Sequence, residues 1–178
     1  MKIIDTPIED LKVIKLDNFE DERGSFKETW NNKKINFIKE KFVQDNESLS
    51  KKNVIRGLHF QNPPYEQGKL VRVTYGSVID IAVDLRKKSK TYGKYFSIEL
   101  NDKNNYLFWI PPGFAHGFVC LKDNTIFNYK CTNYYNKDSE KCIIWNDPDI
   151  NINWKVKKPI ISSKDLQGIR LKDFKSKF

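Results

Sequence analysis

The strongest constraint on the fold is a series of short runs rich in Val, Ile, Phe and Tyr, separated by Gly, Pro, Asn and Asp. Such runs are typical of β-strands, and the residues between them favour turns. The clearest runs lie between residues 69 and 147 and read KLVRVTYGSVIDIAVDLR, YFSIELN, NYLFWIPPGFAHGFVCL, TIFNYKCTNYY and KCIIWND. Many short strands predict a mainly β fold, a barrel or jelly roll with a few short helices.

One segment, Asn31–Gln44, predicts a helix instead. Its apolar residues Ile35, Ile38, Phe42 and Val43 recur at near-helical spacing, with charged residues between them.

The length and composition fit one domain. The chain has 178 residues, of which 39% are hydrophobic, and this is enough for a core if the sheets close on themselves. We therefore expect a single domain over residues 1–178, with a basic C-terminal tail from about residue 169 to residue 178. The start MKIIDTPIED lacks the apolar run of a signal peptide. No window approaches the roughly 18 apolar residues of a membrane span, and we expect a cytoplasmic protein without a membrane partner.

The positive charge is concentrated at one end. The net charge is +9, and residues 155–178 hold eight Lys and Arg against two acids. The other 154 residues carry 24 basic and 21 acidic side chains, an ordinary mixed surface. We therefore expect no nucleic-acid partner. A basic-tail binder of polyanions remains an alternative, which clustered exposed aromatic residues beside the tail would favour.

Two predicted hairpins place polar side chains on single faces. If Gly76 and Ser77 form a two-residue loop, the pairs on one face are Tyr75 with Val78, Val73 with Asp80, Val71 with Ala82, and Lys69 with Asp84. If residues 122–125 form a four-residue loop, Phe118 lies opposite Tyr129 and His116 opposite Cys131. Such polar faces are either solvated or line a wet barrel interior that binds a ligand.

The supply of metal ligands is poor. His59 and His116 are the only two histidines, and catalytic metal sites usually combine two or three His with a carboxylate. Cys120, Cys131 and Cys142 form no CxxC pair, and we expect them to be reduced, buried thiols. We expect neither a metal nor a cofactor.

General acid and base catalysis is the chemistry that these residues favour. No GxSxG elbow is present, and thiols in apolar strands are expected to be weak nucleophiles. A neutral imidazole, with a pKa near 6.5, accepts protons at neutral pH, and a phenol, with a pKa near 10, donates one where negative charge develops. The residues alone leave His59 open as a base, a metal ligand or a packed core residue.

Seven motifs follow one another along the chain: DERGSFKE, VQDN, NVIRGLHFQ, QGKLVRV, WIPPGFAHGFV, NYKCTNYY and IIWNDPDINI. In this order and spacing they resemble the dTDP-4-dehydrorhamnose 3,5-epimerase family, from about residue 3 to residue 168. RGLHFQ and PxGFAHGF are the most specific pair. The resemblance implies a cupin-type jelly-roll barrel, and an enzyme of nucleotide-sugar biosynthesis.

The resemblance also implies roles for single residues. His59 would be the general base, Tyr129 the general acid and Asp165 the partner of the base, and Lys69 would face the developing enolate. The other matched positions would bind the substrate, with Arg56 and His116 beside the sugar, Tyr134 stacking on the nucleotide base, and Arg23, Glu28, Gln44, Asn46, Glu140 and Lys164 holding the nucleotide and its diphosphate.

Strict strand alternation conflicts with part of this implied site. It places Arg56 and His59 on opposite faces of one strand, although both are implied at the substrate. A bulge at Gly57 would bring them to the same face. Asp80 is expected to line the cavity.

The family activity is inversion at C3 and C5 of dTDP-4-dehydro-6-deoxyglucose, giving dTDP-4-dehydrorhamnose for surface polysaccharides such as lipopolysaccharide or capsule. Family members are homodimers in which an N-terminal segment reaches the partner's site, so Arg23, Glu28 and the Gln44 region would act in trans.

Alternatives are a C3-only or C5-only epimerase, and a 3,5-epimerase of a GDP-linked 4-keto heptose. A non-catalytic sugar-binding cupin is a further alternative, which would lack His59 or Tyr129.

Overall fold

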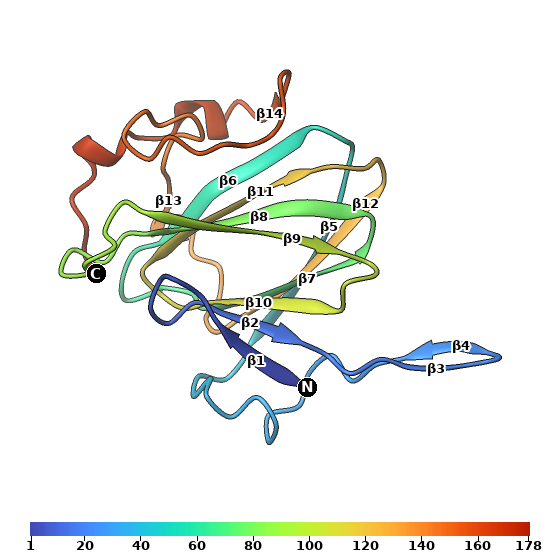
Figure 1. Cartoon of the computed structure of the whole chain (residues 1–178). Coiled ribbons are helices and arrows are strands. Elements are labelled where there is room, and N and C mark those ends of the chain that lie inside the picture. Colours follow the sequence, from blue (N-terminus) through green and yellow to red (C-terminus); the bar gives the residue numbers. More distant parts are fainter.

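Two antiparallel β-sheets face each other in the computed structural model, which describes residues 1–178 (Figure 1). The first sheet has the strand order β1 (Lys2–Asp5), β2 (Lys12–Lys15), β10 (Tyr106–Ile110), β7 (Lys69–Tyr75), β12 (Thr125–Cys131) and β5 (Gln44–Ser50). The second has the order β13 (Glu140–Cys142), β6 (Val54–Gln61), β11 (Phe114–Cys120), β8 (Ser77–Asp84) and β9 (Tyr95–Asn101). The mainly β jelly-roll prediction is confirmed.

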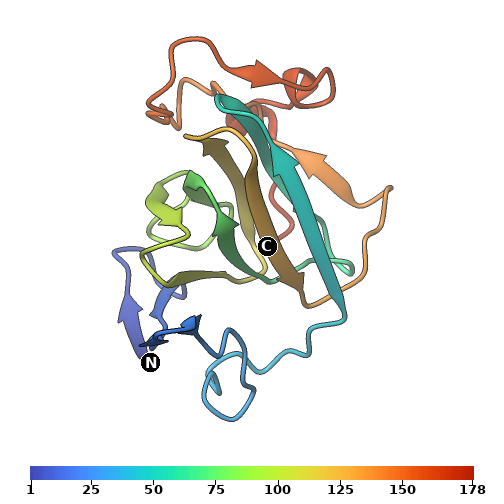
Figure 2. The ribbon, with the colours of Figure 1, turned by 90° about the vertical axis from the view of Figure 1, so that its right-hand side faces the viewer.

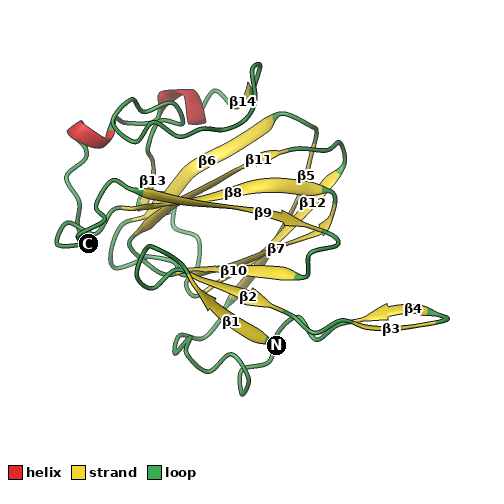
Figure 3. Ribbon diagram, in the orientation of Figure 1, coloured by secondary structure: helices red, strands yellow, loops and turns green.

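The remaining elements are a separate hairpin, a sixth strand at the side of the second sheet, and two short helices. β3 (Phe19–Asp21) and β4 (Gly24–Phe26) form a hairpin that projects away from the barrel (Figure 1). β14 (Ile160–Ile161) pairs with β6 in parallel, and the C-terminal segment lies against the same side of the barrel in both views (Figure 2). The only helices are two short 3₁₀ helices, η1 (Asp165–Gln167) and η2 (Leu171–Asp173) (Figure 3). Neither is long or apolar enough to cross a membrane.

The helix predicted for residues 31–44 was wrong. After one turn, in which the amide of Ile35 donates to the carbonyl of Asn31, the segment becomes irregular. The side chain of Asn31 accepts from the amide of Lys33, and such local bonds compete with a helix. Ile35 and Ile38 are nevertheless buried, because they pack against the outer face of the first sheet.

Both predicted hairpins were also wrong in their pairing. β7 and β8 lie in different sheets, and so do β11 and β12. Gly76, with φ +88°, lies at a corner where the chain leaves one sheet for the other, and an added Cβ there would lie 2.4 Å from the Thr125 hydroxyl. The prediction of which residues share a face was right, because side chains alternate along a strand whichever strand it pairs with.

Three apolar clusters hold the layers together. The central one lies between the sheets and includes Val71 and Phe127 from the first sheet and Ala82 and Phe118 from the second. A second cluster covers the outer face of the second sheet with residues from the C-terminal segment, including Trp154. The segment around residues 30–42 covers the outer face of the first sheet.

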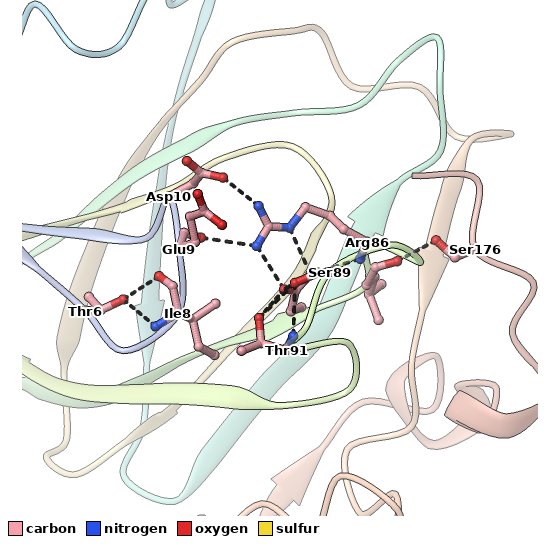
Figure 4. A network of polar contacts seen from close by, with 10 residues as sticks. Thr6, Ile8, Glu9, Asp10, Arg86, Ser89, Thr91 and Ser176 are labelled. Atoms are coloured by element: carbon pink, nitrogen blue, oxygen red, sulfur yellow. Dashed lines mark hydrogen bonds and ion pairs between the residues drawn. The ribbon is translucent and has the colours of Figure 1, made fainter.

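A polar network fixes the loop after β8 to both ends of the chain (Figure 4). The buried carboxylate of Asp84 accepts bonds from the Arg86 guanidinium at 2.9 Å and from the hydroxyls of Ser89 and Thr91. Arg86 also donates to Asp10 in the N-terminal turn. On the far side, Ser176 Oγ donates to the carbonyl of Leu85, so the network joins three distant segments.

We predict that Asp84→Ala lowers the free energy of unfolding by about 2–4 kcal/mol, because it removes the buried carboxylate that accepts from the Arg86 guanidinium and from two hydroxyls. Burial raises the pKa of Asp84, but its hydrogen bonds outweigh this and the net pKa lies below the ordinary value. The difference from wild type should therefore be full at pH 7 and should shrink as the pH falls below about 4. Urea denaturation measures the difference in the free energy of unfolding.

Asp5→Ala is the control. Asp5 forms an exposed ion pair with Lys12, so its loss should change the free energy of unfolding by less than about 0.5 kcal/mol.

Candidate active site

A pocket of about 520 Å³ lies among β6, β11, β12 and the segment after β14. Both histidines reach it. The polar residues that line it are Ser48, Arg56, His59, Lys69, His116, Tyr129, Ser162, Lys164 and Asp165. Strands from both sheets and the C-terminal segment therefore supply one cavity with two imidazoles, a phenol, three cationic groups and a carboxylate.

His59 and Asp165 form a hydrogen-bonded pair at the wall of this pocket. His59 Nε2 lies 2.7 Å from Asp165 Oδ1, and the carboxylate side chain is only 4% exposed. Burial raises the pKa of Asp165, but the hydrogen bond and charge of His59, together with the bonds from Gly57 and Ser162, outweigh it, and the net pKa lies below the ordinary value. The ionised carboxylate holds the imidazole with its proton on Nε2, which leaves Nδ1 free to accept another.

The predicted bulge at Gly57 is present. Arg56 pairs with Phe118 and His59 pairs with His116, so two residues of β6 oppose one residue of β11. Gly57 has φ +133°, and its amide donates to the second oxygen of Asp165 at 3.3 Å. The bulge brings Arg56 and His59 to the same pocket, as the matched motifs require.

The inner wall of the pocket carries a second imidazole and a buried lysine. His116 Nε2 lies 3.0 Å from both oxygens of Asp80, which is fully buried. The prediction that Asp80 lines the cavity was therefore wrong, because Asp80 lies behind His116 and does not reach the pocket. Asp84 belongs to the Arg86 network. Burial lowers the pKa of Lys69, and the nearby Cys131 and Asp80 act in the opposite direction. Its ammonium group lies 3.5 Å from the carbonyl oxygen of His59.

Tyr129 reaches the same pocket from the first sheet. It packs against Phe127 with ring centroids 6.1 Å apart. Burial raises its pKa, and Cys131 adds to the rise. A phenol in this state keeps its proton until negative charge develops beside it.

A smaller pocket of about 130 Å³ adjoins the first and shares His59, Lys69 and Tyr129 with it. Gln44, Asn46 and Glu140 line it, as do Gln61, Gln67 and Tyr135, which the sequence analysis missed. The hydroxyl of Tyr135 donates to Glu140 at 2.8 Å, and Lys164 donates to the same carboxylate. The repeated Tyr of NYY could have raised Tyr135 as a candidate beside Tyr134.

Three predicted residues lie outside both pockets. Arg23 lies in the turn of the projecting β3–β4 hairpin, where its side chain is 85% exposed and pairs with Asp21. Glu28 pairs with Lys34. Tyr134 is exposed, and its carbonyl accepts from Gln61 close to the smaller pocket.

Comparisons with known proteins agree with this geometry. The family model of dTDP-4-dehydrorhamnose 3,5-epimerase matches residues 5–173. The chain belongs to the dTDP-4-dehydrorhamnose 3,5-epimerase family. It is 47% identical to the dTDP-4-dehydrorhamnose 3,5-epimerase of Shigella flexneri over 176 residues, which cover 97% of each chain.

Solved structures of related epimerases have the same fold. A dTDP-6-deoxy-D-glucose-3,5-epimerase from Legionella pneumophila, in complex with dTDP-4-keto-L-rhamnose, is 42% identical with a TM-score of 0.93 over 98% of this chain and 94% of that chain. A 3′-monoepimerase from Streptomyces bikiniensis is 24% identical with a TM-score of 0.89 over 94% of this chain and 86% of that chain. This second likeness is one of fold alone.

We predict that Gly57→Ala destabilises this epimerase much more than Gly24→Ala does. Both glycines have positive φ, +133° and +125°, so both variants carry a backbone penalty of about 1–2 kcal/mol. Only at Gly57 would the new Cβ lie 2.5 Å from the Cα of Gly117, whereas nothing lies within 4 Å at Gly24. Urea denaturation should show a further loss of about 2 kcal/mol or more for Gly57→Ala. Equal losses would mean that the bulge relaxes without cost.

Proposed function

We propose that the chain is a 3,5-epimerase that converts dTDP-4-dehydro-6-deoxyglucose into dTDP-4-dehydrorhamnose. The observation that carries the proposal is the carboxylate-held imidazole of His59 in one pocket with Tyr129, Lys69 and Arg56. Proton removal and return at carbon change no oxidation state, so these groups supply the whole reaction.

The ketone at C4 of the sugar acidifies the hydrogens on C3 and C5. His59 removes each one through Nδ1, and the resulting imidazolium is stabilised by Asp165. The electrons of the broken C–H bond move onto the ketone oxygen, and this enolate is stabilised by the positive charges of Lys69 and Arg56. Tyr129 returns a proton to the opposite face of the carbon, which inverts it. Before the second carbon reacts, His59 releases its proton to solvent and Tyr129 takes one up.

The smaller pocket is proposed to bind the nucleotide end of the substrate. Gln44 and Asn46 offer amide groups there, and Gln44 Nε2 donates to Asn46 Oδ1 at 3.0 Å. The exposed ring of Tyr134 offers a stacking surface for the base, and Lys164 offers a charge for the diphosphate. Glu140 holds Lys164 in place and accepts from ribose or base donors. His116 is proposed to contact the sugar from the inner wall.

Arg23 and Glu28 are proposed to act in the partner's site of a homodimer, with residues 1–178 of each subunit as one domain. The β3–β4 hairpin projects from the barrel in Figure 1 and presents Phe19 and Phe26, which are 63% and 69% exposed. Exposed aromatic residues on a projecting arm favour contact with another subunit. We further propose a cytoplasmic enzyme whose product supplies lipopolysaccharide or capsule.

Two enzymatic alternatives use the same machinery, a mono-epimerase and a 3,5-epimerase of a GDP-linked 4-keto heptose. The fold does not discriminate between inversion at one and at two carbons, since the 3′-monoepimerase shares it. The identity of 47% to a 3,5-epimerase favours inversion at both. A non-catalytic sugar-binding cupin has no need of a base and an acid in one pocket, so it is less favoured.

We predict that the protein incorporates two deuterium atoms when it is incubated with dTDP-4-dehydro-6-deoxyglucose in heavy water, because each inverted carbon receives a solvent proton. Mass spectrometry of the product measures this. His59→Ala should abolish exchange at both carbons, whereas Tyr129→Phe should retain more proton loss than completed inversion. One deuterium would indicate a mono-epimerase, and none would exclude this substrate. Full exchange in His59→Ala would assign the base to another group.

Mixed dimers test the contribution of Arg23 in trans. We expect Arg23→Ala and His59→Ala to be nearly inactive alone, and co-refolding equal amounts should restore activity to about a quarter of wild type, since half of the dimers then hold one intact site. The control mixes His59→Ala with Tyr129→Phe. Each subunit supplies its own His59 and Tyr129 to its own pocket, so no mixed dimer holds an intact site and the activity should not exceed that of Tyr129→Phe alone. Failure of the first pair to complement would place Arg23 in its own subunit's site or outside both.

A further inference from the structure

A thiol lies beside the proposed base. Cys142 of β13 is directly opposite His59 of β6 in the sheet register. Its Sγ, a ring nitrogen of His59 and a carboxylate oxygen of Asp165 all lie within 4.8 Å of one another. The proposed reaction has no use for this thiol, and burial raises its pKa to about 12, so it does not act as a nucleophile.

These three side chains offer nitrogen, sulfur and oxygen donors, which is the ligand set that Zn²⁺ takes in proteins. With bonds of about 2.0–2.3 Å, the ligands of a tetrahedral Zn²⁺ lie about 3.3–3.8 Å apart. The distances from Cys142 Sγ, at most 4.8 Å, reach this spacing by a contraction of up to roughly 1 Å. His59 Nε2 and Asp165 Oδ1, which are 2.7 Å apart, would have to separate by about 0.6 Å if both bound the ion. A turn of the Cys142 side chain would give up a weak bond from Sγ to the carbonyl of Ile143, at 3.3 Å, and a contact with the backbone of Leu58.

Access and charge also permit an ion here. The His59 side chain is 29% exposed, and both His59 and Asp165 line the main pocket, which leaves a fourth position for water. Lys164, an exposed cation of the same pocket, is paired with Glu140 at 2.5 Å, and this carboxylate offsets its charge.

We propose that His59, Cys142 and Asp165 form an inhibitory binding site for Zn²⁺ and related divalent cations that accept sulfur and nitrogen ligands. The inhibition, though not the binding, rests on the proposed role of His59 as the base. A neutral imidazole has one lone pair and one N–H. If the ion takes the lone pair of either ring nitrogen, the other nitrogen carries the proton, and neither can accept one from the sugar. If the ion binds Nε2, the proton between His59 and Asp165 moves to Nδ1, and in either case the Cys142 thiol releases its proton to solvent as its thiolate binds the ion.

Co²⁺ is a suitable probe, because tetrahedral thiolate ligation gives a sulfur-to-metal band in the near ultraviolet and strong visible bands. We expect the wild-type protein to show both bands on titration with Co²⁺, and Cys142→Ala to lose the near-ultraviolet band. Cys120→Ala is the matched control, since Cys120 is a buried thiol that lies in the central core and outside this cluster. Its spectrum with Co²⁺ should match that of the wild type.

Epimerase assays with added Zn²⁺ give the second readout. Half-inhibition of Cys142→Ala should need at least about tenfold more Zn²⁺ than wild type or Cys120→Ala, since a lost ligand weakens metal binding by at least that factor. Activity without metal should be unchanged in Cys142→Ala, and a chelator should reverse the inhibition. A wild-type Co²⁺ spectrum without a thiolate band, or equal Zn²⁺ sensitivity in all three proteins, would overturn the proposal. The spectrum needs no turnover, so it separates failure of this site from failure of the proposed function.

Discussion

The hydrogen bonds that Asp165 accepts hold the site together. One carboxylate oxygen accepts from the ring of His59 and the other from the amide of Gly57. The first bond fixes the tautomer of the imidazole, and the second holds the bulge that turns Arg56 toward the same cavity. The carboxylate is itself placed by the pairing of β14 with β6, so an ordinary backbone ladder sets the position of a reacting group. Loss of this one side chain would disturb the proposed base, the cation beside it and the local shape of β6 together.

The fold was predictable from the sequence at the level of strands and their faces. Alternation within a strand is a local property, and residues predicted to share a face, such as Val71 and Ala82, do so, with that face in the central core. Partners of each strand depend on the path of the chain between sheets, and here local turn signals were misleading. Gly76 looks like a hairpin turn, but it lies at a corner between sheets. The apolar spacing around Ile35 resembled that of a helix. In the structure the same residues belong to an irregular segment that packs its apolar side chains on the outer face of the first sheet.

The site was predictable where motifs mark single residues. His59, Lys69 and Tyr129 meet in one pocket, as the matched motifs imply. Tyr135 was missed because its place in the smaller pocket depends on the path of the loop after β12. The neighbourhood of Cys142 was missed for a similar reason, since nothing in the sequence pairs the short strand β13 with β6.

Asp165 is synthesised long after His59, the residue that it contacts. His59 belongs to β6, in the first half of the chain, whereas Asp165 follows the last strand. A nascent chain on the ribosome can therefore assemble most of the barrel while its imidazole still lacks the carboxylate that orients it. On the proposed mechanism, the base is oriented only after the segment beyond β14 has been synthesised and has folded against β6. A chain that stops before β14 keeps the pocket residues of the two sheets, including His59, Lys69 and Tyr129, but lacks the proposed partner of the base.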